Sequence, residues 1–186
     1  QITAQTGDLT SSANASFEFH IHAVARYATP ALNTYTWLAT LGGGWSLRLD
    51  QWSFAGKMGH TKGGVADYGS DVDSVFGADA HIVFVSDAAE GETRIYVNGN
   101  LAGSVGTALN TTEASGPINL MGSGEGWPAT GSTLYGWATY PKALGEADVA
   151  RLYASIVGHE SRGDDTVVEL WGPGFYEING NQPSIY

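Results

Sequence analysis

Three potential metal ligands, Glu18, His20 and His22, alternate with apolar residues in the segment EFHIH. Side chains at every second position of a β-strand share one face, so the three would point the same way. Two imidazoles and a carboxylate could bind zinc, with His60 or His81 as a further ligand. A strand with one polar and one apolar face explains the same alternation, and spacing alone completes no ligand set. We therefore expect no transition metal at this segment.

Carboxylates recur in the segment DYGSDVD, where Asp67, Asp71 and Asp73 could offer oxygen ligands to calcium. Their spacing is not that of an EF-hand loop. A solvated acidic loop explains the same residues, so calcium and simple solvation are both open interpretations of this segment.

Aromatic residues provide the best indication of a binding face. Trp45, Trp52, Tyr68 and Trp127 lie in or beside glycine-rich segments, and a flat ring stacks well on the apolar face of a sugar. Trp127 is followed by a proline and is expected to be the most exposed of them. The other tryptophans lie in expected strands and are predicted to be core residues: Trp37, Trp137 and Trp171. A core position is also an open interpretation for Trp45 and Trp52. The predicted ligand-binding residues are therefore Trp127, Tyr68, Asp71 and Asp73.

No motif predicts catalysis. The chain contains neither the G-x-S-x-G nucleophile pattern nor a P-loop. The acidic pairs Asp164-Asp165 and Glu90/Glu92 are more simply explained as solvated loop charges. We therefore expect a non-enzymatic protein with no catalytic residues.

The composition limits the partners of the chain. Its 186 residues include 19 acidic and 8 basic side chains, and the resulting net charge of −11 repels phosphate backbones and anionic lipids. Nucleic acid is therefore not an expected partner.

The chain has no cysteine, which excludes disulfides and thiolate metal sites. It has no apolar run of about 18 residues, so no membrane insertion is expected. It begins with Gln1 rather than Met, as a processed product or a fragment would.

Short β-branched and aromatic runs separated by 26 glycines predict many strands with tight turns, as in a sandwich or barrel. The clearest unit is GETRIYVNGNLAGSV, residues 91–105, in which Asn98-Gly99 offers the two positive-φ residues of a type I′ turn. We expect this hairpin in the inner part of the sandwich. The segment HIVFVSD, residues 81–87, is apolar on both faces and predicts a central strand. Other strands are expected at 16–27, 34–41, 45–50, 52–58, 117–122, 133–140 and 166–171, and a glycine-rich loop at 60–79.

The C-terminal part of the chain differs from this pattern. A short amphipathic helix is expected at residues 145–157, because apolar side chains recur there with helical spacing: Val149, Leu152, Tyr153 and Ile156. Residues 173–186 are aromatic and contain proline, and are expected to form an extended tail. We expect this tail to pack on a neighbouring subunit, giving a homo-oligomer. The predicted organisation is one domain, residues 1–172, followed by the tail.

The order of these pieces resembles the laminin-G and pentraxin type of concanavalin A-like domain. In that type a buried strand, an NG or DG hairpin and a glycine-ended strand precede the pattern G-x-(hydrophobic)-x-x-Y-x-x-A-L and a short helix. The pattern is filled here by Gly136, Tyr140, Ala143 and Leu144. The resemblance covers residues 16–171 and implies an antiparallel two-sheet jelly-roll sandwich with one short helix.

The resemblance also implies a function. Such domains are recognition modules, so we expect a carbohydrate-binding module on a cell-surface, secreted or virion protein. Members often hold calcium in loops, but no ligand motif of the family maps onto this chain. A structural module, such as a capsid decoration or fibre component that binds protein neighbours, is the alternative. A divergent glycoside hydrolase or lyase is the second alternative, although the E-x-D-x-x-E strand of the glucanase branch is absent.

Overall fold

The computed structural model describes residues 2–5, 13–27, 31–114, 116–122 and 124–160. The predicted strand at 166–171 and the predicted tail at 173–186 lie outside these residues. The described strands are β1 (Ile2–Gln5), β2 (Ala15–His22), β3 (Thr36–Thr40), β4 (Trp45–Asp50), β5 (Lys57–Lys62), β6 (Ala66–Asp73), β7 (Asp79–Asp87), β8 (Glu92–Val97), β9 (Asn100–Val105), β10 (Pro117–Leu120) and β11 (Thr133–Tyr140). The helical segments are η1 (Gly42–Gly44), α1 (Thr111–Ala114) and α2 (Glu146–Glu160).

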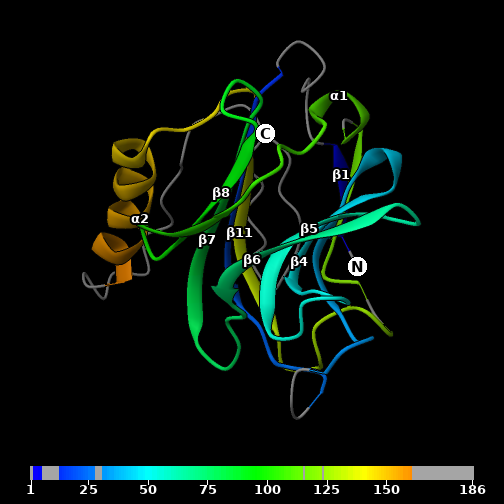
Figure 1. The fold of residues 1–186 in the computed structure, drawn as a ribbon. Helices are drawn as coiled ribbons and strands as arrows, with labels where there is room; N and C mark the ends of the chain where they lie inside the picture. The colour runs from blue at the N-terminus through cyan, green and yellow to red at the C-terminus, as the bar shows by residue number, and fades with distance from the viewer. Residues whose placement is uncertain (1, 6–12, 28–30, 115, 123, 161–186) are drawn as a thin grey trace.

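The strands form two antiparallel sheets that face one another as a jelly-roll sandwich (Figure 1). The six-stranded sheet has the order β1-β10-β3-β4-β5-β6, and the five-stranded sheet has the order β11-β2-β7-β8-β9. The predicted fold class is therefore confirmed. Both β4 and β11 begin and end where the sequence pattern placed them.

Strand β7 shows why its sequence is apolar on both faces. Ile82 and Phe84 belong to the main core between the sheets, whereas Val83 and Val85 contact a second cluster on the opposite face. That second cluster includes Val149 of α2, which covers the outer face of the five-stranded sheet (Figure 1). β7 is the middle strand of its sheet, as predicted. The predicted short helix is also confirmed, and no helix among the described residues is long and apolar enough to cross a bilayer.

The Asn98-Gly99 hairpin is confirmed between β8 and β9. Asn98 has φ 50° and Gly99 has φ 78°, the left-handed backbone that a type I′ turn requires. The Asn98 side-chain oxygen accepts a hydrogen bond from the His81 backbone N–H at 2.9 Å, which fastens the turn to β7. The hairpin was predicted to lie in the inner part of the sandwich. Among the described residues its second strand, β9, instead lies at the edge of the five-stranded sheet. Ile95 of β8 is fully buried in the core.

The predicted loop at residues 60–79 is wrong. β5 continues through Lys62, the chain turns at Gly64 with φ 72°, and β6 runs back beside β5. The core-facing side of β6 carries Tyr68, Ser70 and Val72. Because one of these three is polar and the outward positions are glycine or aspartate, the apolar alternation of the strand is weak.

The strand predicted at residues 52–58 is also wrong in its first half. Trp52, Ser53 and Phe54 form a bend, and β5 begins only at Lys57. The bend folds back onto the sheet, where a Cβ atom on Gly69 would lie 2.4 Å from the Phe54 ring. The glycine therefore makes room for the aromatic side chain, and the bend places Trp52 beside the outer face of the six-stranded sheet.

Candidate functional site

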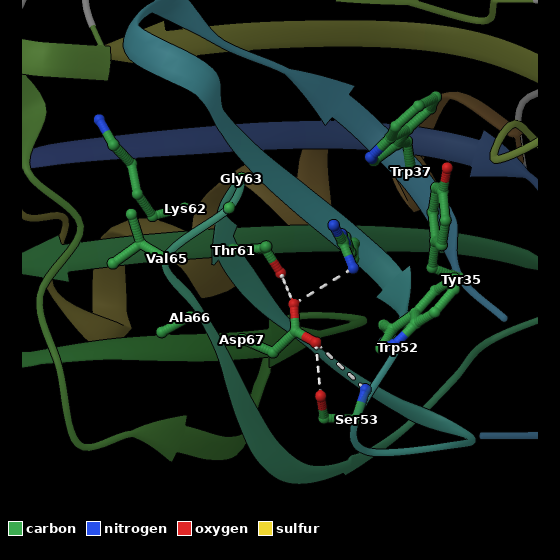
Figure 2. A pocket seen from close by; sticks show the side chains of 12 residues that line it. Tyr35, Trp37, Trp52, Ser53, Thr61, Lys62, Gly63, Val65, Ala66 and Asp67 are labelled. Carbon is green, nitrogen blue, oxygen red and sulfur yellow. Dashed lines mark hydrogen bonds and ion pairs between the residues drawn. The ribbon is translucent and has the colours of Figure 1, made fainter. Parts of the chain in front are cut away.

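A pocket of about 380 Å³ opens on the outer face of the six-stranded sheet. Its walls come from β3 to β6, the bend after β4 and the turn between β5 and β6 (Figure 2). Aromatic side chains line one side, and hydrogen-bonded polar side chains line the floor. The lining residues include Tyr35, Trp37, Arg48, Trp52, Ser53, Thr61, Lys62 and Asp67.

The aromatic wall consists of Tyr35, Trp37 and Trp52. The Tyr35 ring centroid lies 4.9 Å from that of Trp37 and 5.7 Å from that of Trp52. Trp52 is 42% exposed, so it offers a ring to a ligand. Aromatic rings with one apolar face open to solvent suit the apolar face of a pyranose. Trp37, predicted as a core residue, is only partly buried and faces the pocket.

The predicted exposure of Trp127 is wrong, because this side chain is only 7% exposed. Its ring packs edge-on against Trp37, with centroids 5.4 Å apart. Gly122 permits this position, since a Cβ atom there would lie 2.2 Å from the Trp127 ring. The Arg26 side chain also donates to the Trp127 carbonyl at 2.9 Å. Trp127 therefore supports the aromatic wall from behind, and Trp52 is the exposed ring.

Arg48 forms the charged part of the floor. It pairs in register with Trp37 across β3 and β4, and its guanidinium carbon lies 4.7 Å from the Tyr35 ring centroid. Nη1 donates to the Asp67 carboxylate at 3.3 Å, and Nε donates to the Ser46 hydroxyl at 3.3 Å. Burial lowers the pKa of Arg48, and the negative charge of Asp67 acts in the opposite direction. An arginine remains protonated under such a shift, so Arg48 and Asp67 form a buried ion pair.

The Asp67 carboxylate is the anchor of the site (Figure 2). One oxygen accepts from Arg48 and from the Thr61 hydroxyl at 2.8 Å. The other accepts from the Ser53 backbone N–H at 3.1 Å and from the Ser53 hydroxyl at 2.8 Å. Two carboxylate oxygens have about four acceptor positions, and all four are used. Asp67 therefore holds the bend that carries Trp52 against the sheet.

None of the four predicted ligand-binding residues lines this pocket. Tyr68 faces the core side of β6, with its ring 5.0 Å from His60. Asp71 and Asp73 are exposed on the outer face of β6, and the Asp73 carboxylate accepts from Lys57 at 2.7 Å. The structure therefore does not bring the four together, and a binding role for them stays a prediction.

Glu18 lies beneath α2 rather than on an open face. It is 8% exposed, and its two oxygens contact His81 Nε2 at 2.9 Å and the Tyr140 hydroxyl at 2.5 Å. Burial, the Glu18 charge and this hydrogen bond together raise the pKa of Tyr140. Tyr140 thus donates to Glu18 as a neutral phenol, and the carboxylate is engaged within the fold.

The two histidines of the same strand have other partners. His22 Nδ1 contacts the Asp79 carboxylate at 2.8 Å, and the His20 ring lies 4.7 Å from the Tyr135 ring. Hydrogen bonding to His22 is the main cause that lowers the pKa of Asp79. Across the residues that the structure describes, no three His, Cys, Asp or Glu side chains are grouped so that they could hold a metal ion.

Sequence reasoning missed Arg48, Thr61, Trp37 and the bend at Trp52. The signal was present in WSLRLD, where Arg48 alternates with the buried residues Leu47 and Leu49. An arginine at the centre of a strand indicates a polar patch on the outer face of its sheet. Its partner Asp67 could not be found in this way, because the strand that carries it was predicted to be a loop.

Comparison with known proteins places the chain in a family. Residues 1–150 match a laminin-G family model described as the concanavalin A-like lectin/glucanases superfamily. The chain therefore belongs to this superfamily. Among curated proteins no significant match was found.

Solved structures of similar fold include the binding domain of botulinum neurotoxin serotype C1, which is 15% identical with a TM-score of 0.54. The alignment covers 77% of this chain and 36% of the toxin chain. A sialidase of Trypanosoma rangeli is 14% identical with a TM-score of 0.51, and the alignment covers 80% of this chain and 24% of that one. A structure of NanB with Optactamide is 16% identical with a TM-score of 0.54, covering 81% of this chain and 26% of NanB. The chain thus spans well under half of each of these proteins, and identities this low show a common fold alone.

Proposed function

We propose that this chain is a non-enzymatic recognition module that binds carbohydrate in the pocket beside Trp52. The observation that carries the proposal is the half-exposed Trp52 ring, held in place beside a hydrogen-bonded floor. The ring offers a flat surface on which the apolar face of a sugar can stack. Polar side chains and backbone groups around the ring can form hydrogen bonds with the hydroxyl groups of the sugar. The position of the ring is fixed before binding, because Asp67 anchors the bend through Ser53.

The carboxylate content of the pocket supports a binding role rather than hydrolysis. Glycoside cleavage commonly uses two carboxyl groups about 5–10 Å apart, one of which must exchange a proton. Within the described part of the chain, Asp67 is the single carboxylate among the pocket-lining residues, and its acceptor positions are filled. A hydrolase would need a second acid in this pocket.

The similar structures support the proposal only in general terms. One of them, 15% identical with a TM-score of 0.53, comes from botulinum neurotoxin type C, whose cell entry is dependent upon interaction with two ganglioside molecules. Binding domains of this fold are thus found on proteins that act at cell surfaces. We propose an extracellular, cell-surface or virion location for the present chain on the same basis. The assembly role of residues 173–186 and a calcium ion near Asp71 and Asp73 are further proposals.

A glycan array tests the proposed function. The wild-type chain should bind a limited set of glycans, and Trp52→Ala should lose at least about tenfold in affinity for them, the loss expected for one stacked ring. Tyr135→Ala is the matched control, because Tyr135 is 48% exposed but lies on the other sheet. Unchanged binding by Trp52→Ala, or equal loss in both variants, would contradict the assignment of the pocket. A parallel array with chelator tests the calcium proposal.

A further inference from the structure

We infer that the pocket selects uncharged saccharides and discriminates against acidic ones. This inference rests on the proposed function and adds the class of ligand. It follows from the charged side chains that line the pocket, Arg48, Lys62 and Asp67, and from what each of them already contacts.

Arg48 offers little to a ligand carboxylate or sulfate, because it is nearly buried and already paired with Asp67. Its side chain is 10% exposed, one face of the guanidinium lies over the Tyr35 ring, and Nη1 donates to Asp67. The Asp67 charge balances the Arg48 charge inside the floor. A ligand anion would therefore meet a guanidinium that is poorly accessible and whose charge is already balanced.

Lys62 is likewise engaged. Its ammonium donates to the Glu113 carboxylate and to the Gly43 carbonyl at 2.6 Å, and it lies 5.4 Å from the Trp45 ring centroid. Figure 2 shows the Lys62 side chain extending away from the aromatic wall. The Lys62 and Trp45 hydrogen bonds lower the pKa of Glu113, so the carboxylate stays charged and balances the ammonium.

The remaining electrostatics also disfavour anions. The whole chain has a net charge of −11, which repels negative ligands over roughly a Debye length. The Arg48 guanidinium already lies over the Tyr35 ring, so that ring is not open to a second cation. A neutral sugar needs no charged partner and can stack on the exposed ring of Trp52.

The test compares matched glycans on the same array: neutral oligosaccharides and the same cores carrying terminal sialic acid or sulfate. The neutral members should bind, and each acidic derivative should bind at least about tenfold more weakly, because its charge would be desolvated without a partner. Binding of the neutral members should change less than about twofold between about 0.1 M and about 1 M NaCl. Preferential binding of the acidic members, weakened by salt, overturns this inference but leaves the proposed function in place. Binding of no saccharide overturns both.

Glu113→Gln provides a second test within the same chain. The substitution removes the charge that balances Lys62, and Glu113 itself is not among the pocket-lining residues. The affinity for acidic glycans should therefore rise by about threefold, and the affinity for neutral glycans should not change. Asp71→Asn is the matched control, since it removes an exposed charge from the same sheet without freeing Lys62. Equal gains in the two variants would show that net charge alone is responsible and would overturn the role given to the Lys62–Glu113 pair.

Discussion

His60 makes the stability of the pocket-bearing sheet depend on pH. It lies on β5 with its side chain fully buried, and Nε2–H donates to the Thr107 carbonyl at 3.0 Å. The ring lies 5.7 Å from Trp45 and 5.0 Å from Tyr68, and Nδ1 is buried without a hydrogen-bond partner among the described residues. Burial lowers the pKa of His60 to about 4, although the hydrogen bond to Thr107 acts in the opposite direction.

The direction of the pH effect follows from the two pKa values. The unfolded chain has a histidine pKa of about 6.5, so between pH 6.5 and pH 4 the unfolded state binds the proton and the folded state does not. The stability from neutral His60 is present above about pH 6.5 and is lost as pH falls through this window. Linkage gives a loss of about 2 kcal/mol at about pH 5, and about 3 kcal/mol below about pH 4.

Urea unfolding of wild type and His60→Gln between about pH 8 and pH 5 measures this effect. Glutamine can keep a donor for the Thr107 carbonyl but does not titrate. The unfolding free energy of the wild type should therefore fall by about 2 kcal/mol relative to that of His60→Gln between about pH 8 and about pH 5. His22→Gln, at a side chain that is 31% exposed, controls for removing a histidine elsewhere. Parallel pH curves for wild type and His60→Gln would refute the reasoning.

Two further predictions concern the fold. Gly99→Val should lower the unfolding free energy by about 1–3 kcal/mol, because Gly99 has φ 78° and a Cβ atom there would lie 2.9 Å from Tyr153. Gly106→Val is the control, since a Cβ atom at Gly106 meets nothing within 4 Å. Equal melting temperatures for the two variants would contradict the turn assignment. Asp67→Asn should cost about 3 kcal/mol in urea unfolding and weaken glycan binding, because it leaves the Arg48 charge without its carboxylate. Asp71→Asn, on the same strand but exposed, should stay within about 0.5 kcal/mol of wild type, and a similar loss in both would argue against the anchor role of Asp67.

The strands that the sequence predicted well are those whose two faces differ clearly or are both apolar. β4 alternates apolar residues with Ser46, Arg48 and Asp50, and β7 is buried on both faces. β6 was missed because its outward side carries aspartates and a glycine that equally suit a loop. Gly69 is there to admit the Phe54 ring, a tertiary contact that no local pattern contains.

The tryptophans show a similar limit. A tryptophan among glycines suggested exposure at Trp127, yet Gly122 and Gly126 are the residues that let rings pack closely around it. A Cβ atom on Gly126 would lie 2.6 Å from Tyr35 and 2.7 Å from Trp37. Glycine beside an aromatic residue can therefore indicate close packing as well as a mobile loop. Trp52 lies on an exposed bend that is held in place by hydrogen bonds between Ser53 and Asp67. These hydrogen bonds depend on the pairing of strands and cannot be recognised from the local sequence.

The two faces of β5 connect acid stability to ligand binding. His60 points into the core and Thr61, the next residue, points to the pocket floor, where it donates to Asp67. A proton on His60 would be buried beside Trp45 and Tyr68, so it disfavours the folded position of β5. Any movement of β5 also moves the Thr61 hydroxyl, which helps to hold Asp67. Because Asp67 holds the bend that carries Trp52, that bend would move as well. A glycan bound at Trp52 should in turn stabilise the folded state by mass action, so saturating glycan should shift the acid-induced unfolding of the wild type to lower pH.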